Sequence, residues 1–217
     1  AEIDHSLKRL QTDYLDLYII HRWDYGTPIE ETMEALHDLV KMGKVRYIGA
    51  SSMHAWQFAK AQFIAEKNGW TKFVSMQNLY NLLYREEERE MIPLLQDQKV
   101  AMTPWSPLAG GRLTRDIGAI TARASQAVQA DLPAYIVASD NEVISRVHKL
   151  ADERGITRGQ VATAWMLSKD YVTAPLIGAT KVKYLEDALG AFEVALSAEG
   201  IKYLEEAYVP RNITGYR

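Results

Sequence analysis

The chain has 217 residues, 47% hydrophobic and 24% charged, a composition that is ordinary for a globular protein of one domain. Its formal net charge of −3 gives no reason to expect a nucleic acid or a membrane as partner, and no apolar run is long enough to span a membrane. Cysteine is absent, which excludes disulfides, thiol nucleophiles and thiolate metal sites and fits a cytoplasmic location, the default expectation.

A helix and a strand are predicted at the start of the chain. Glu2 to Gln11 has apolar residues at helical spacing, and it leads into Tyr14 to Asp24, which predicts a strand buried on both faces. His21 lies at the carboxyl end of this strand, where functional groups of parallel βα proteins collect. The strand alone leaves a second interpretation open, in which His21 is a buried histidine bonded to a neighbouring carbonyl.

Helices and strands alternate along the rest of the chain. Thr27-Pro28-Ile29-Glu30 has the residues of a helix start, with Thr27 as N-cap, and Gly43 ends that helix. Helical crossovers of this length favour parallel pairing, so the pattern predicts a parallel α/β sheet, either open or closed into a barrel. Further strands are predicted at Val45 to Ala50, Phe73 to Gln77, Val100 to Trp105 and Val172 to Ile177, and further helices at His54 to Asn68, Glu86 to Gln98, Asn141 to Arg154, Thr157 to Lys169, Lys181 to Ala191 and Ser197 to Tyr208. Pro93 is expected to kink or restart the helix from Glu86 to Gln98. Thr157-Arg158-Gly159-Gln160 is a capping box, and the last helix is capped at Ser197.

Five motifs follow one another at sensible spacings. They are Ser6 to Tyr18 leading into His21-Arg22, then Gly49 to Ser52, Gln77 to Asn81, Pro104 to Leu113, and Ile177 to Lys181. In this order they resemble the aldo-keto reductase family, and the resemblance covers nearly the whole chain except the segment after Arg112. Each motif alone is a weak signal, whereas the ordered set is a strong one.

The resemblance implies a parallel (β/α)8 TIM barrel and NADPH-dependent reduction of an aldehyde or ketone carbonyl. Such a barrel needs eight strands and ~250 residues, so five recognisable strands predict an incomplete barrel that lacks three βα units, or roughly 90 residues. Residues 1–217 are then a single domain, the C-terminal part of the barrel. The missing units carry the family's catalytic aspartate, tyrosine and lysine, which leaves His21 as the catalytic residue of this chain. The alternative is a catalytically incomplete NADPH-binding or regulatory remnant.

The resemblance also implies the cofactor-binding residues, and NADP is favoured over NAD. Ser51, Ser52 and Gln77 match groups that bind the nicotinamide carboxamide, although many members have asparagine where Ser52 stands. Trp105 matches the aromatic residue under the nicotinamide ring, with a core tryptophan as the alternative. Ser106, Leu108, Gly110 and Arg112 match the loop along the pyrophosphate. Thr180, Lys181 and Lys183, with Gly178 before them, match the site of the adenosine 2′-phosphate. Glu186 and Asp187 match positions that contact adenine, although asparagine is commoner where Asp187 stands.

Three further expectations concern parts outside these motifs. Tyr25 and Tyr80 are loop candidates for a replacement proton donor, but the sequence places no lysine beside either. Arg112 to Ala138 is expected to form a lid over the cofactor, with a surface loop of no role as the alternative. The histidines have no metal-like spacing, so the expected partner is a small carbonyl compound, and unpaired strand edges predict association into a homo-oligomer.

Overall fold

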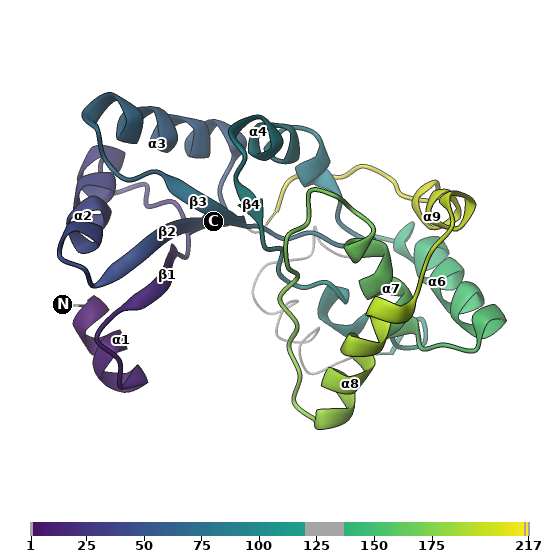
Figure 1. Cartoon of the computed structure of the whole chain (residues 1–217). Helices are drawn as coiled ribbons and strands as arrows, with labels where there is room; N and C mark the ends of the chain where they lie inside the picture. Colours follow the sequence, from purple (N-terminus) through teal and green to yellow (C-terminus); the bar gives the residue numbers. More distant parts are fainter. Residues whose placement is uncertain (1, 120–136, 215, 217) are drawn as a thin grey trace. The chain divides into compact units, whose positions relative to one another are not determined.

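The structure, a computed structural model, describes residues 2–119, 137–214 and 216 (Figure 1). The chain forms two compact units. One comprises Ala1–Asn78, Glu90–Met102 and Tyr216–Arg217, and the other comprises Leu79–Arg89 and Thr103–Gly215. The single domain of residues 1–217 stays a prediction.

The first unit contains a four-stranded sheet in the order β1-β2-β3-β4, in which neighbouring strands run parallel. This confirms the predicted parallel α/β arrangement. Helix α2 packs against β2 and α3, and α4 packs against α3 and β4 (Figure 1). The elements of this unit are α1 (Glu2–Leu10), β1 (Leu15–Ile20), α2 (Ile29–Lys41), β2 (Val45–Ser51), α3 (Ala55–Asn68), β3 (Phe73–Gln77), α4 (Met91–Gln98) and β4 (Ala101–Met102).

Strand β1 is the edge of this sheet, and its side chains are partly or fully exposed, so the prediction that it is buried on both faces is wrong. No residue of β1 is fully buried, and Leu17 is 38% exposed. Among the described residues, no strand pairs with the outer side of β1. The buried strand is β2, where Ile48 and Ala50 are fully covered. An apolar run shows that a strand can be buried, but not which strand receives neighbours on both sides.

Two predicted helix starts also need correction. Thr27 does not cap α2, because its hydroxyl donates to Asp24 Oδ2 (2.7 Å) and the helix begins one residue after Pro28. The predicted helix from Glu86 to Gln98 is two elements, a short 3₁₀ turn η1 (Glu86–Glu88) and α4. Pro93 therefore lies in the first turn of α4, where a missing N–H costs little.

The second unit is mainly helical. Helix α7 contacts α6 and α8, and α9 packs on α6 (Figure 1). Trp165 is fully buried and stacks on Tyr80 with ring centroids 5.4 Å apart. The predicted caps at Thr157 and Ser197 are confirmed, because each side chain accepts a backbone N–H of the first helical turn. The elements are α6 (Asp140–Arg154), α7 (Arg158–Leu167), α8 (Val182–Gly190), α9 (Ala198–Glu205), and the 3₁₀ turns η1, η2 (Ala109–Gly111) and η4 (Ala191–Glu193).

The last two predicted strands are shorter than expected. Of Val100 to Trp105 only β4 forms, and Trp105 makes single parallel bridges to Leu79 and Leu176. Among the described residues, Val172 to Ile177 has only isolated bridges, at Val172 and at Leu176, so the fifth strand is wrong as a continuous ladder. Pro104 and Pro175 explain this, because proline has no N–H to donate to a neighbouring strand.

The predicted lid lies largely outside the described residues, which omit 120–136. The part from Arg112 to Ala119 consists of turns and short irregular stretches. No helix in the described part of the chain is long and apolar enough to cross a membrane.

Candidate functional site

His21 follows β1 directly, at the carboxyl end of the strand, and its side chain is exposed. The interpretation of His21 as a buried histidine is therefore wrong. An exposed imidazole can donate or accept a hydrogen bond, so its position leaves it available to a ligand.

The carboxyl ends of β2 and β3 bring three predicted cofactor residues together. Ser51 and Gln77 are partners in the strand register, and the Ser51 hydroxyl donates to the Gln77 carbonyl oxygen (2.6 Å). The hydroxyls of Ser51 and Ser52 are 3.2 Å apart, and both side chains are buried while Gln77 is half-buried. Two hydroxyls and an amide side chain at the carboxyl ends of neighbouring strands can provide hydrogen-bond donors and acceptors to a carboxamide.

Asn78 organises this group, although sequence reasoning gave it no role. Its Oδ1 accepts the backbone N–H of Ser52 (2.8 Å), and its Nδ2 donates to the hydroxyl of Tyr216 (3.0 Å). The Tyr216 ring in turn packs edge-on against His54, with centroids 4.8 Å apart. Asn78 lies in the motif from Gln77 to Asn81, and this position could have suggested a role for it in the site. Nothing in the sequence connects it to Tyr216.

Ser52 has a left-handed backbone with φ 49°. Such a conformation costs a residue other than glycine about 1–2 kcal/mol. Five described residues other than glycine have positive φ, and two of them, Gln11 and Lys99, directly follow a helix. The other three are Ser52, Ser106 and Ala109, which lie at or beside predicted cofactor positions.

The loop after Trp105 is folded into a tight turn that contains two of these strained residues. Ser106 (φ 59°) and Ala109 (φ 52°) are followed by Gly110 (φ 65°) and Gly111 (φ 92°). The Gly110 N–H donates to Ser106 Oγ (3.2 Å), and the Ala109 N–H donates to the Ser106 carbonyl (2.9 Å). Backbone strain of this kind concentrates at ligand sites, where surrounding contacts hold it in place.

Contacts on either side fix this turn. Asn81 is fully buried and donates from Nδ2 to the Ser106 carbonyl oxygen (2.9 Å). Leu108 and Trp105 are half-buried, so Trp105 is not a core tryptophan, a position that Trp165 takes instead. Arg112 donates from Nη1 to Asp140 Oδ2 (2.7 Å), and Arg211 binds the same carboxylate.

The predicted 2′-phosphate residues gather at the start of α8. Gly178, Thr180, Lys181 and Lys183 are exposed, and Lys181 occupies the N-cap position. The first turn of α8 has no acidic residue, so free N–H groups and lysine side chains make this end positive.

The two residues assigned to adenine differ in their surroundings. Glu186 is exposed, whereas Asp187 is half-buried and accepts the Thr157 hydroxyl (2.6 Å). Asp187 thus also supports the start of α7, because Thr157 is the N-cap of that helix.

Of the two candidate tyrosines, Tyr80 is not placed to donate a proton to a ligand. The Tyr80 hydroxyl is buried and donates to Glu88 Oε1 (2.7 Å), with the Tyr171 hydroxyl also 2.7 Å away. Burial, with the negative charge of Glu88, raises the pKa of Tyr80 well above its usual range. Tyr25 is 67% exposed, and its hydroxyl accepts from Gln57 Nε2 (3.2 Å).

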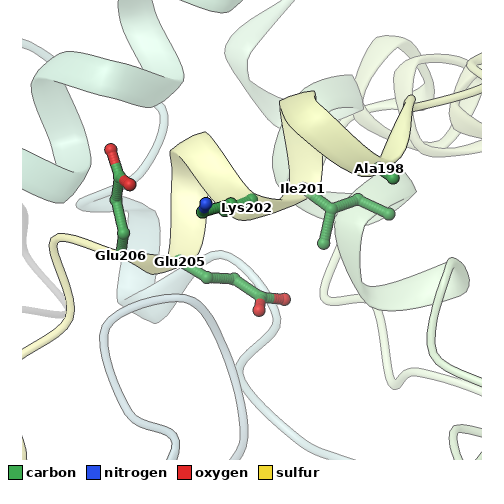
Figure 2. Close-up of a pocket in the computed structure, with 5 residues that line it drawn as sticks. All are labelled: Ala198, Ile201, Lys202, Glu205 and Glu206. Atoms are coloured by element: carbon green, nitrogen blue, oxygen red, sulfur yellow. The ribbon is translucent and has the colours of Figure 1, made fainter.

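Two other features contain none of the predicted site residues. In the described part of the chain, no group of His, Asp and Glu residues could hold a metal ion. Figure 2 shows an open hollow along α9, in which Glu205 and Glu206 point away from each other. Glu205 is already bound by Trp165 Nε1 (2.8 Å) and by Lys169, so it supports the helix packing. The hollow is lined by Ala198, Ile201, Lys202, Glu205 and Glu206.

Comparison with known proteins identifies the family. Residues 1–209 match the model described as Aldo/keto reductase family. Aldo-keto reductases of Fusarium vanettenii and Alternaria alternata are 48% and 49% identical to 99% of this chain, and the versiconal hemiacetal acetate reductase of Aspergillus parasiticus is 47% identical to 97% of it. The chain spans 58%, 58% and 62% of the lengths of these three relatives. By this match and by its ordered motifs, the chain belongs to the aldo-keto reductase family.

Proposed function

We propose that the chain is the cofactor-binding part of an NADPH-dependent oxidoreductase that reduces an aldehyde or ketone carbonyl. The observation that supports this most is the strained backbone at Ser52, Ser106 and Ala109. Family membership and the reductase names of the relatives agree with carbonyl chemistry.

The residues present fit the cofactor in two respects. At Gly110 a Cβ would meet nothing within 4 Å, so the backbone of the turn faces open space that a pyrophosphate can approach. At the start of α8, Lys181 and Lys183 are exposed and suit a phosphate. Ser51, Ser52 and Gln77, which the resemblance assigns to the carboxamide, belong to the first unit. Trp105, which the resemblance assigns to the ring, belongs to the second unit.

In the proposed reaction, NADPH supplies the hydride when bound. Negative charge develops on the carbonyl oxygen as the hydride arrives, and a positioned donor stabilises it. His21 is the residue of this chain proposed for that role, as a hydrogen-bond donor that orients the carbonyl. By resemblance, Ser51 and Ser52 would bind the carboxamide of the cofactor and Trp105 would stack on its ring. A ring held in one orientation would lower the entropy cost of the reaction.

We further propose that the chain forms the C-terminal part of a (β/α)8 barrel, and that the proton-donating tyrosine with its lysine and aspartate lies outside these 217 residues. The commitment of the Tyr80 hydroxyl to Glu88 supports this, because that tyrosine cannot replace the donor. The same observation favours a second candidate, an NADPH-binding or regulatory remnant without catalysis.

Fluorescence titration with NADPH, followed by absorbance at the nicotinamide band after adding an aldehyde, tests the proposal. We expect saturable NADPH binding that Lys181→Ala weakens. Because the proton donor is proposed to lie outside these 217 residues, turnover is measured on the full-length protein. Turnover there that His21→Ala removes and His5→Ala retains would establish the reductase, because His5 is an exposed histidine of α1. Binding without turnover by the full-length protein would establish the remnant. Absence of NADPH binding would refute both.

A further inference from the structure

Asp140 binds two arginines although it is almost fully buried. It is 1% exposed and is the first residue of α6. Arg112 Nη1 donates to its Oδ2 (2.7 Å), and Arg211 Nη2 donates to its Oδ1 (2.5 Å). The backbone N–H of Val137 adds a third bond to Oδ2 (3.3 Å). A buried carboxylate with these donors has a fixed orientation, because any rotation would break charge-assisted bonds.

Arg211 is itself held in place. Its backbone N–H donates to Glu86 Oε1 (2.8 Å), and the same oxygen accepts the Tyr208 hydroxyl (2.6 Å). The Arg211 guanidinium carbon lies 5.5 Å from the centroid of the Tyr208 ring. The segment from Tyr208 to Arg211 is therefore anchored on Glu86, and through Arg211 it restrains Asp140.

An arginine side chain such as that of Arg112 has many rotamers, so contacts that restrict it can strengthen its binding of an anion. It directly follows the turn with positive φ at Ala109, Gly110 and Gly111. A guanidinium loses substantial rotamer freedom when it binds an anion, and that loss weakens binding unless the side chain is ordered beforehand. Asp140 orders it in the free protein.

We propose that Asp140 is a positioning residue that holds the Arg112 guanidinium in the orientation that binds the cofactor pyrophosphate, with Arg211 as the second support. This inference rests on the proposed NADPH binding and adds the contacts that prepare Arg112 for it. Ordering one long side chain in advance corresponds to about 3- to 10-fold in affinity.

The test separates the two kinds of phosphate. ADP-ribose has the pyrophosphate without the 2′-phosphate, and adenosine 2′-monophosphate has the reverse. In calorimetric titrations, Asp140→Asn should lower the affinity for ADP-ribose and for NADPH by about 3- to 10-fold and leave the affinity for adenosine 2′-monophosphate unchanged. Glu142→Gln is the matched control, an acidic residue of the same helix that is paired with Arg146 and exposed, and it should change none of the three.

A double-mutant cycle shows whether Asp140 acts through Arg112. In the Arg112→Gln background, Asp140→Asn should have no further effect on ADP-ribose. If Asp140→Asn alone does not fold, the double variant Asp140→Asn/Arg211→Gln takes its place, because it removes one cation together with the anion. It should bind ADP-ribose and NADPH more weakly and adenosine 2′-monophosphate as before. Circular dichroism verifies the fold of each variant.

The alternatives have distinct outcomes. Equal weakening of all three ligands by Asp140→Asn, or an effect that persists in the Arg112→Gln background, would overturn the inference in favour of a structural role. An unchanged ADP-ribose affinity in Arg112→Gln would overturn it as well. If the wild-type chain binds none of the ligands, the proposed NADPH binding itself fails.

Discussion

The side-chain oxygen of Asn78 accepts the backbone N–H of Ser52 across the ends of two neighbouring strands, at 2.8 Å. This bond holds a serine in a left-handed conformation beside Ser51 and Gln77. Asn78→Ala removes the acceptor inside the protein and should lower the free energy of unfolding by about 1–3 kcal/mol. Urea denaturation measures this, and NADPH affinity should fall with it. Tyr216→Phe removes the bond from Asn78 Nδ2 and leaves the bond to Ser52 in place, so a loss as large as that of Asn78→Ala would contradict this account.

Exchanges of alanine and glycine test the strain in the turn. Ala109→Gly should stabilise the protein and Gly110→Ala should destabilise it, each by about 1 kcal/mol, because only glycine adopts positive φ without a steric cost. Urea midpoints of the two variants should therefore move in opposite directions. A shift of both in the same direction would show that contacts, and not backbone strain, dominate this turn.

Tyr80→Phe separates a structural role from a catalytic one. Removal of the hydroxyl deprives Glu88 and Tyr171 of a buried partner and should cost about 1–3 kcal/mol of stability. Any NADPH oxidation that the protein performs should remain within a factor of two, an order-of-magnitude expectation for a group with no part in proton transfer. Loss of turnover in a folded Tyr80→Phe protein would reverse the assignment.

His148 should make stability depend on pH. Burial lowers the pKa of His148, and repulsion from Arg158 lowers it further, although Asp116 opposes this. A folded pKa below the unfolded value of about 6.5 means that the unfolded chain binds more protons in that window. The histidine's contribution to stability is therefore complete above about pH 6.5 and is lost as pH falls below it.

Urea denaturation of wild type and His148→Gln at pH 7.5 and pH 5.5 isolates this contribution. The wild type should lose more stability between the two conditions than the variant, because the carboxylates common to both cancel in the comparison. Equal losses would mean that His148 does not titrate differently in the folded and unfolded states.

The exposed edge at β1 predicts self-association. For the 217 residues on their own, without the further barrel strands, we propose that copies of the chain pair along β1, because an edge strand offers unpaired N–H and C=O groups to a neighbour. Light scattering should then show a dimer or larger species that Leu17→Lys reduces. Leu10→Lys is the control, since Leu10 is exposed on α1 away from the strand edge in sequence. A wild-type chain that remains monomeric would exclude this pairing.

Local patterns predicted much of this fold, and tertiary contacts account for what was missed. Caps at Thr157 and Ser197 depend on residues three positions apart, so the sequence contains the whole signal. Ser51 and Gln77 each lie at the carboxyl end of a predicted parallel strand, and such ends meet at one edge of a sheet, as the strand register shows for these two residues. The bond from Asn78 to Tyr216 joins residues 138 positions apart, which no local pattern encodes.

Charged residues were the least predictable part of the candidate site. Asp140 and Arg211 look like surface residues in the sequence, since acidic and basic side chains are mostly exposed. Their burial depends on one another and on Arg112, so the signal exists only once three distant segments meet. Pro175, in contrast, was visible and could have warned against a continuous last strand.

The division of the chain into units limits how the protein can be dissected. The polypeptide passes from one unit to the other four times, so neither unit is an uninterrupted stretch. A fragment ending at Met102 would keep Arg85 but lose Glu205 and Tyr208, which bind its side chain and its backbone N–H. Removal of the last two residues would likewise take Tyr216 from Asn78. Truncation mapping is therefore unsuited to locating function here, and point substitutions are the informative route.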